Sequence, residues 1–194
     1  RLISQQTQKY STVIRNAANA VTQQGTYPAN NSLADQLKIV ARLIKGGLST
    51  RVYMVSTGGY DTHSVQANSG DTTTGAHATL LQRLSDACKA FQDDLAQLNI
   101  QDRVIGMTYS EFGRRIKSNS SSGTDHGAAA PMFLFGSQIE NGVLGNNPTI
   151  PTNASVNDNI PMQYDFRSVY ATILEKWFCL DKTVVDGLFP PNVN

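Results

Sequence analysis

The amino-acid sequence predicts an α/β fold in which a mostly parallel sheet is flanked by helices. Short apolar runs alternate with amphipathic stretches, in the order helix, strand, helix, strand, strand, helix. A parallel sheet needs cover on both faces and usually has more than three or four strands. Residues 1–194 are therefore expected to form a single α/β domain that is an incomplete part of a larger one. We expect a missing N-terminal segment or a partner chain to complete the sheet.

The predicted helices repeat apolar residues at intervals of three and four, whereas the predicted strands are short, apolar and β-branched. The helices are residues 2–23, 33–45, 79–98 and 166–178, and the strands are residues 51–59, 103–110 and 131–136. Ser32 is the expected N-cap of the second helix. Residues 137–164 are rich in Asn, Pro and Gly and are expected to be irregular. The buried stripe of the first helix is expected to include Leu2, Ile3, Tyr10, Val13, Ile14, Ala17 and Val21.

The composition excludes several classes of partner. The net charge is +1, which favours neither nucleic acid nor an anionic membrane. No apolar run is long enough for a transmembrane segment. Two cysteines are too few for a disulfide framework, and both Cys88 and Cys179 are expected in the core. The few charges and many Asn, Gln, Ser and Thr residues are typical of an exported protein, and a start at Arg1 without a signal peptide predicts a processed product or a piece of a longer one.

The chemically distinctive residues follow or precede the predicted strands. In open α/β sheets ligands bind beyond the carboxyl ends of the strands. Such residues gather there, in "GGYDTHSVQ", "SEFGRR" and "GTDHGAAAP". The candidates are Asp61 and His63 after the first strand, Glu111, Arg114 and Arg115 after the second, and Asp125 and His126 before the third.

The spacing of these residues suggests a shared divalent ion. Asp61 and His63 are two apart, so in an extended chain they point to the same side. Asp125 and His126 are adjacent and diverge in an extended chain. They would serve one ion across a bend, serve two ions, or leave His126 as the ligand with Asp125 orienting another group. Mixed nitrogen and oxygen ligands suit Zn or Mn, and Ca if carboxylates dominate.

Each of these residues also has a structural interpretation. Asp61 could cap its loop, and Asp125 could form an Asx-turn. Glu111 could pair with an arginine at the surface. Arg114 and Arg115 could face solvent. His77, at the start of the long helix, is expected to be structural.

Several segments, in this order, resemble the DUF1501 family of exported bacterial proteins: "RVYMVSTGGYDTHSVQ", "LLQRLSDACKAFQDDL", "SEFGRR", "GTDHGAAAPMFLFG" and "DFRSVYATILEKWF". The resemblance runs from about Leu33 to the end of the chain. It implies an alkaline-phosphatase-like fold, because that family is placed with the alkaline phosphatase and sulfatase superfamily. Members of that superfamily hold one or two divalent metals at the strand ends. Many DUF1501 proteins begin with a twin-arginine export signal, which implies a periplasmic, secreted or cell-surface location.

The resemblance also implies roles for individual residues. Asp61 and His63 look like the pair that binds the first metal, although the superfamily spaces its ligands more widely. In "SEFG", Glu111 looks like the next carboxylate, with Phe112 where a histidine is expected. His126 looks like the last histidine ligand, with Asp125 secondary. Nothing in residues 1–50 matches the superfamily's nucleophile loop, so the catalytic nucleophile is expected outside this chain.

Two functions follow from the resemblance. The first is a metal-dependent hydrolase of small phosphate or sulfate esters, in which a divalent metal polarises the ester and Arg114 holds the anionic group. The second is a catalytically degenerate, exported binding or surface protein that keeps the fold. A hydroxyl and a carboxylate facing Asp61 from an N-terminal segment would distinguish the first from the second.

Overall fold

The computed structural model describes residues 2–22 and 24–189 and divides into two compact units. The first unit comprises Arg1–Tyr109, Ser118–Asp125 and Met132–Glu140. The second unit comprises Ser110–Lys117, His126–Pro131 and Asn141–Asn194.

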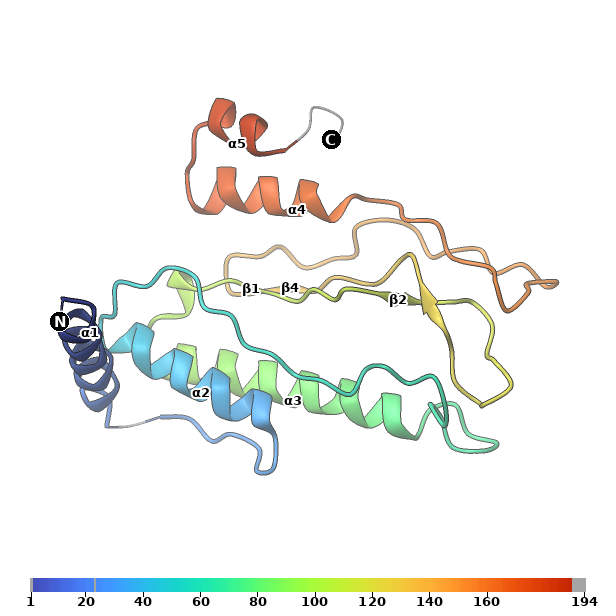
Figure 1. Ribbon diagram of the computed structural model, residues 1–194, viewed down its shortest axis with the longest axis horizontal. Coiled ribbons are helices and arrows are strands. Elements are labelled where there is room, and N and C mark those ends of the chain that lie inside the picture. The colour runs from blue at the N-terminus through green and yellow to red at the C-terminus, as the bar shows by residue number, and fades with distance from the viewer. Residues whose placement is uncertain (1, 23, 190–194) are drawn as a thin grey trace. The chain divides into compact units, whose positions relative to one another are not determined.

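The first unit is built on a helical layer. Helices α2 (Ser32–Lys45) and α3 (Ala76–Gln97) lie side by side (Figure 1). Their apolar stripes face each other, as the three- and four-residue spacing predicts. A 3₁₀ turn, Gln101–Arg103, follows α3. The hydrophobic core is formed by residues of these two helices and of the segments next to them: Val21, Leu33, Ala34, Leu37, Val40, Ala41, Ile44, Ala87, Phe91, Leu95, Leu98 and Ile100.

Helix α2 begins one residue earlier than the sequence indicated. Asn31, not Ser32, is the N-cap, and its side chain accepts a hydrogen bond from the Ala34 amide. Asn and Ser are about equally good caps. The Asn31 side chain also donates to the Arg83 carbonyl of α3 at 2.8 Å, a second bond that ties the start of α2 to its neighbour.

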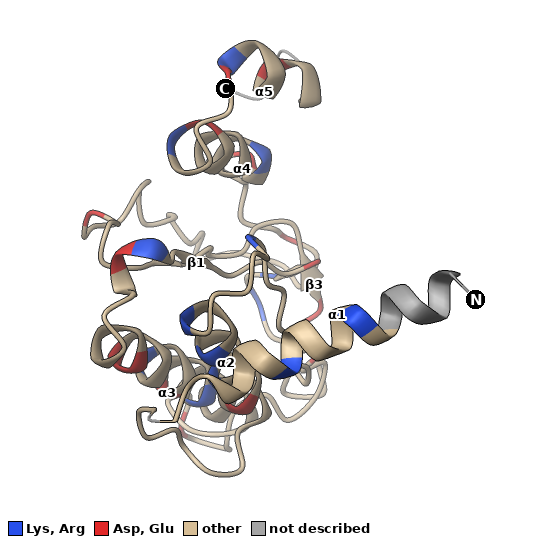
Figure 2. Ribbon diagram, turned by 90° about the vertical axis from the view of Figure 1, so that its left-hand side faces the viewer, with Lys and Arg blue, Asp and Glu red and all other residues tan. Residues whose placement is uncertain are grey.

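Among the described side chains of helix α1 (Leu2–Asn19), those near its C-terminal end pack on this layer. Ala17 is buried, as is Val21 just beyond the helix, whereas Tyr10 and Val13 are exposed. The predicted Leu2 and Ile3 side chains and residue 23 lie outside the described residues. The helix carries Lys9 and Arg15 but no acidic residue, so its charge is basic (Figure 2).

The predicted mostly parallel sheet is not formed. Among the described residues, strands β1 (Gly106–Met107) and β4 (Leu134–Phe135) pair antiparallel in the first unit. Strands β2 (Gly113–Arg114) and β3 (His126–Gly127) pair antiparallel in the second. The chain is therefore a mixed fold of helices with two small antiparallel sheets.

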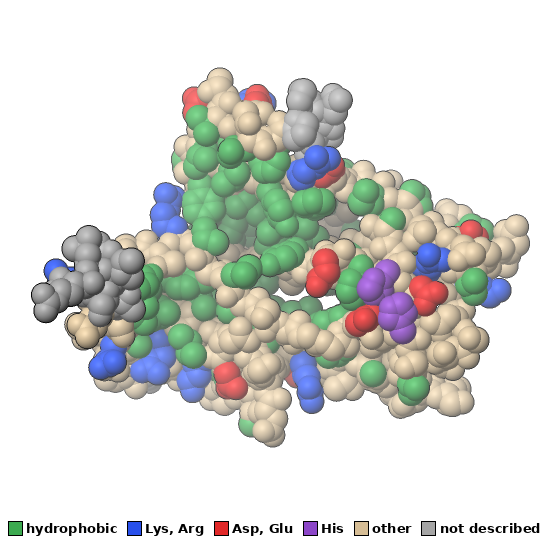
Figure 3. Space-filling model, in the orientation of Figure 1, with side chains coloured by type: hydrophobic (Ala, Val, Ile, Leu, Met, Phe, Trp, Pro, Cys, Tyr) green, Lys and Arg blue, Asp and Glu red, His purple; other side chains and the backbone are tan. Residues whose placement is uncertain are grey.

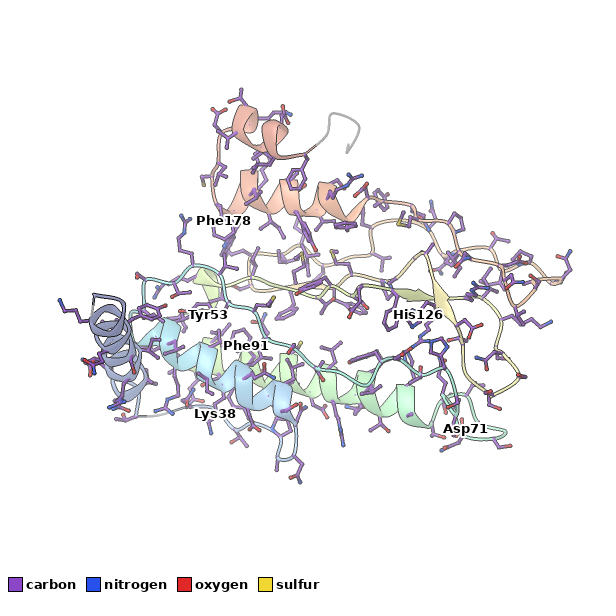
Figure 4. The ribbon with its side chains drawn as sticks, viewed as in Figure 1. Lys38, Tyr53, Asp71, Phe91, His126 and Phe178 are labelled. Carbon is purple, nitrogen blue, oxygen red and sulfur yellow. The ribbon has the colours of Figure 1, made fainter. Side chains whose placement is uncertain are left out.

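The predicted first strand shows why the fold prediction failed. Residues 51–60 carry no strand assignment, although they contain the expected apolar run. Tyr53, labelled with the core residue Phe91 in Figure 4, packs with Val55 against the helical core. Val52 and Met54 are 70% and 78% exposed. The run therefore covers helices with alternate residues, whereas a strand of a parallel sheet is buried on both faces.

A fully buried carboxylate joins the loop after α1 to helix α3. Asp94 is 0% exposed. It accepts hydrogen bonds from the Gly25 backbone amide at 2.6 Å, the Tyr27 hydroxyl at 2.8 Å and the Gln24 side-chain amide at 3.2 Å. Burial, and then the bond to Asp94, raise the pKa of Tyr27 well above its usual range. Tyr27 therefore stays a neutral donor at physiological pH.

The second unit contains helix α4 (Phe166–Thr172), which continues into a π-helical turn (Ile173–Trp177), and helix α5 (Lys182–Leu188). The predicted helix 166–178 is confirmed. Asp165 caps α4 and binds the Arg167 guanidinium, whose hydrogen bonds lower the pKa of Asp165 to about 2. Apolar side chains gather over α4 (Figure 3).

Other expectations have mixed outcomes. Cys88 is half-buried, but Cys179, predicted in the core, is exposed. Among the described residues no helix is long and apolar enough to cross a membrane, as predicted.

Candidate functional site

Two loops of the first unit hold the candidate site together. Backbone amides of Val65 and Gln66 donate to the carbonyls of Ser121 and Ser122 at 3.0 and 2.9 Å. A Cβ atom on Gly123 would lie 2.2 Å from the His63 carbonyl carbon, so only glycine allows the loops to approach this closely. The loop after the predicted first strand is thereby fixed against the loop that precedes "TDHG".

His63 lies between two carboxylates. Its Nε2 is 3.0 Å from Asp61 Oδ1, and its Nδ1 is 3.0 Å from Asp125 Oδ1. The side chains are 47%, 61% and 42% exposed for His63, Asp61 and Asp125. A neutral imidazole carries one N–H, so it can donate to only one of the two carboxylates. The other contact needs a second proton on the ring or a cation between nitrogen and oxygen.

This donor set fits a divalent cation. Two atoms that bind one ion at about 2.1 Å lie about 3.0 Å apart when they form a right angle at the ion. The 3.0 Å between His63 Nε2 and Asp61 Oδ1 has this value, which is also the distance of an ordinary N–H···O hydrogen bond. Histidine ligands generally donate their second N–H to a carboxylate, which fixes the tautomer and the ring orientation. Asp125 Oδ1, 3.0 Å from His63 Nδ1, is the carboxylate in this position.

Asn119 supports the site and was not singled out from the sequence. Its Nδ2 donates to the His63 carbonyl at 2.9 Å and to Asp125 Oδ1 at 3.0 Å. Its Oδ1 accepts from the amides of Ser121 and Gly123. The only signal in the sequence is an Asn that begins a Ser- and Gly-rich turn, a common Asx pattern. Asn119 therefore orients Asp125 from one side while His63 faces it from another.

The second unit carries the other predicted residues on the β2–β3 hairpin. Arg114 pairs with His126 in register, and Gly113 pairs with Gly127. A Cβ atom on Gly113 would lie 1.8 Å from the Ala129 carbonyl oxygen, and one on Gly127 would lie 2.4 Å from Arg114 backbone atoms. The glycines of "FGRR" and "DHGA" are thus required by the close approach of the two strands.

Aromatic and cationic side chains lie on one face of this hairpin. The rings of Phe112 and His126 are stacked, with centroids 3.8 Å apart and planes at 5°. The Arg114 guanidinium carbon is 5.0 Å from the centroid of Phe112. Arg115 donates to the His126 carbonyl at 3.2 Å and also binds the Val156 carbonyl. Figure 4 labels His126 on its strand.

The remaining candidates have simpler surroundings. Glu111 is exposed and makes no hydrogen bond or ion pair within the part of the chain that the structure describes. His77 makes an edge-to-face contact with Tyr60 at the start of α3, in keeping with a structural role.

The structure thus brings together Asp61, His63 and Asp125, the candidates of the first unit. Glu111, Arg114 and His126 belong to the second unit. Metal binding by any of these residues stays a prediction.

The comparison with known families decides the relationship. The profile of a family described as a protein of unknown function (DUF1501) matches residues 3–189. The chain belongs to the DUF1501 family. No curated protein and no solved structure matches the chain. All five segments that carry the resemblance fall within the matched residues of this DUF1501 protein, so the predicted resemblance to the DUF1501 family is confirmed.

Proposed function

We propose that this DUF1501 protein is an exported, metal-dependent hydrolase of small phosphate or sulfate esters. The observation that carries the proposal is the position of His63 between two carboxylates. Each imidazole nitrogen faces a carboxylate oxygen at 3.0 Å, and the three side chains are exposed enough for an ion and a substrate to reach. The export and the ester chemistry follow from the resemblance of the three motifs to the alkaline phosphatase and sulfatase superfamily.

The first unit supplies the proposed primary ligands. Asp61 and His63, through Nε2, hold the cation, which is Zn, Mn or Ca. Asp125 accepts the Nδ1 proton of His63, so that the lone pair of Nε2 stays available to the cation. Asn119 donates to Asp125 and keeps that carboxylate in place.

The second unit supplies the proposed additional groups. His126 follows Asp125 directly, and a trans peptide keeps their Cα atoms about 3.8 Å apart. The resemblance assigns His126 the role of a further ligand, Glu111 that of completing or orienting the site, and Arg114 that of holding the anionic group of the ester. A bound divalent cation polarises the ester and lowers the pKa of a bound nucleophile.

Metal binding with histidine variants tests the proposal. Zn²⁺ and Mn²⁺ affinities are measured by calorimetry, with a competing chelator, on the unaltered chain and on Asp61→Asn, His63→Gln and His126→Gln. Loss of a direct ligand is expected to weaken binding by more than the roughly 10- to 100-fold that is typical when a partner of a ligand is lost. His77→Gln is the matched control, because it removes an imidazole outside the site and is expected to leave the affinity unchanged.

Hydrolysis separates the two functions that the resemblance implies. Metal-loaded protein is assayed with p-nitrophenyl phosphate and p-nitrophenyl sulfate. Turnover that disappears in His63→Gln supports the hydrolase. Because the nucleophile is expected outside residues 1–194, site-dependent metal binding without turnover favours the degenerate binding protein when the assayed protein includes the segment that supplies the nucleophile. Metal affinity that is the same in all variants refutes the proposed metal site.

A further inference from the structure

The ring of Phe112 is stacked on the ring of His126. The two residues are diagonal neighbours on one face of the β2–β3 hairpin, since Arg114 pairs with His126 and Phe112 is two residues before Arg114. Their rings are nearly parallel, at 5°, with centroids 3.8 Å apart. Phe112 is half-buried, whereas His126 is exposed. An exposed imidazole therefore has one face covered by a ring that is itself held in place.

The stack restricts the imidazole in the way that ligation requires. Rotation about the bond between Cβ and the ring has a broad, shallow energy profile for histidine, so an exposed histidine samples many ring planes. The nitrogen lone pairs lie in the plane of the ring. Holding that plane parallel to Phe112 therefore restricts the directions in which His126 can offer a lone pair.

Two arginines contact the Phe112 ring and the His126 backbone. The Arg114 guanidinium lies 5.0 Å from the Phe112 centroid, a cation–π contact that favours the observed position of the ring. Arg115 donates to the His126 carbonyl and to the loop at Val156, which fixes the backbone of His126. The backbone and the ring plane of His126 are thus held by different residues.

We propose that Phe112 is a positioning residue that holds the plane of the His126 imidazole fixed for binding a divalent cation. The inference rests on the proposed function, because it gives His126 a ligand to bind. Phe112 itself touches neither cation nor substrate and acts only through His126. An aromatic stack of this kind corresponds to about a two- to twelvefold effect on an equilibrium.

The test compares substitutions that remove the ring with one that keeps it. Zn²⁺ affinity is expected to fall about two- to twelvefold in Phe112→Leu. It is expected to stay at the value of the unaltered protein in Phe112→Tyr, which keeps the ring. Phe133→Leu is the matched control, because Phe133 is an exposed phenylalanine of the first unit. If Phe112→Leu does not fold, Phe112→Met replaces it, since Leu and Met fill similar volumes.

A spectroscopic readout distinguishes positioning from a general loss of structure. In the metal-free protein the ring protons of His126 are expected to resonate upfield because they lie over Phe112. They should move to the position of an exposed histidine in Phe112→Leu but not in Phe133→Leu. His126→Gln identifies these signals among the three histidines.

The outcomes separate this inference from the proposed function. If His63→Gln and His126→Gln weaken Zn²⁺ binding but Phe112→Leu does not, the positioning role is refuted and the function stands. Weakening by His63→Gln alone also refutes the positioning role, since His126 is then not a ligand. If neither histidine affects Zn²⁺ binding, the proposed function is refuted and the inference is refuted with it.

Discussion

Replacing Asp125 with asparagine tests whether this carboxylate orients the site or binds the cation itself. The substitution keeps the shape of the side chain and removes its charge. In the structure Asp125 Oδ1 accepts from His63 Nδ1 and from Asn119 Nδ2, both at 3.0 Å. An amide oxygen can still accept these bonds, but charge-assisted bonds are about twice as strong as neutral ones.

The expected loss of affinity is moderate. Removing a partner of a metal-binding histidine typically lowers metal affinity by about 10- to 100-fold. Asp125 is 42% exposed, so solvent screens its charge and the lower limit applies. We expect roughly a tenfold loss in Zn²⁺ affinity, which is about 1.4 kcal/mol. The free energy of unfolding of the metal-free protein is expected to change by less than about 1 kcal/mol, as for other exposed ionic contacts.

The Zn²⁺ affinities of Asp125→Asn and Asp61→Asn are compared by chelator-competition titrations. The free energy of unfolding of each variant is measured in urea. Asp61→Asn is expected to lose much more affinity, because it weakens a direct ligand. Equal losses in the two variants would show that Asp125 is a ligand. An unchanged affinity in Asp125→Asn would refute the orienting role, and the contact to His63 would then be only a surface hydrogen bond.

Three further predictions concern close contacts and buried bonds of the first unit. In Gly123→Ala the new Cβ atom would lie 2.2 Å from the His63 carbonyl carbon, so the loop should move away from His63. Both Zn²⁺ affinity and thermal stability should fall. A melting temperature equal to that of the unaltered protein would contradict the close approach. Asp94→Ala should lower the free energy of unfolding by about 3 kcal/mol in urea, because it leaves buried donors without an acceptor, and a loss below about 1 kcal/mol would contradict this reasoning. Tyr27→Phe should cost about 1–2 kcal/mol at pH 7. The pKa of Tyr27 is raised on folding, so the stability contributed by the Tyr27 hydroxyl is complete below about pH 10 and is lost as pH rises further. The unaltered protein and Tyr27→Phe should therefore become closer in stability above about pH 10. A constant difference would contradict the buried bond.

The helices could be predicted because each carries its own signal. Apolar residues at intervals of three and four predicted α2, α3 and the helix that begins at Phe166, within a few residues of their observed bounds. The sheet could not be predicted in the same way. A short apolar run is compatible with a buried strand and with an extended segment that covers helices on one side, and only the surroundings distinguish them. Residues 51–60 are of the second kind.

The candidate site was predicted where a short local pattern determined the geometry. The two-residue spacing of Asp61 and His63 placed both on one side, and the structure has their side chains 3.0 Å apart. The contact of His63 with Asp125 joins residues far apart in the chain, so only the general expectation that the loops meet pointed to it. Asn119 was missed because its hydrogen bonds depend on the fold of its own turn, and the surrounding serines made it look like an ordinary polar loop residue.

The motif "TDHG" shows how much adjacent residues can differ in what they do. Neighbours in an extended chain point to opposite sides, and the sequence left open whether Asp125 and His126 share a role. In the structure Asp125 faces His63 and Asn119, whereas His126 pairs with Arg114 and stacks on Phe112. Asp125 thus meets a histidine and an amide through hydrogen bonds, whereas His126 meets an aromatic ring. In the proposed site these contacts give Asp125 the orienting role, because it accepts the Nδ1 proton of His63, and leave the ring of His126 to offer a lone pair.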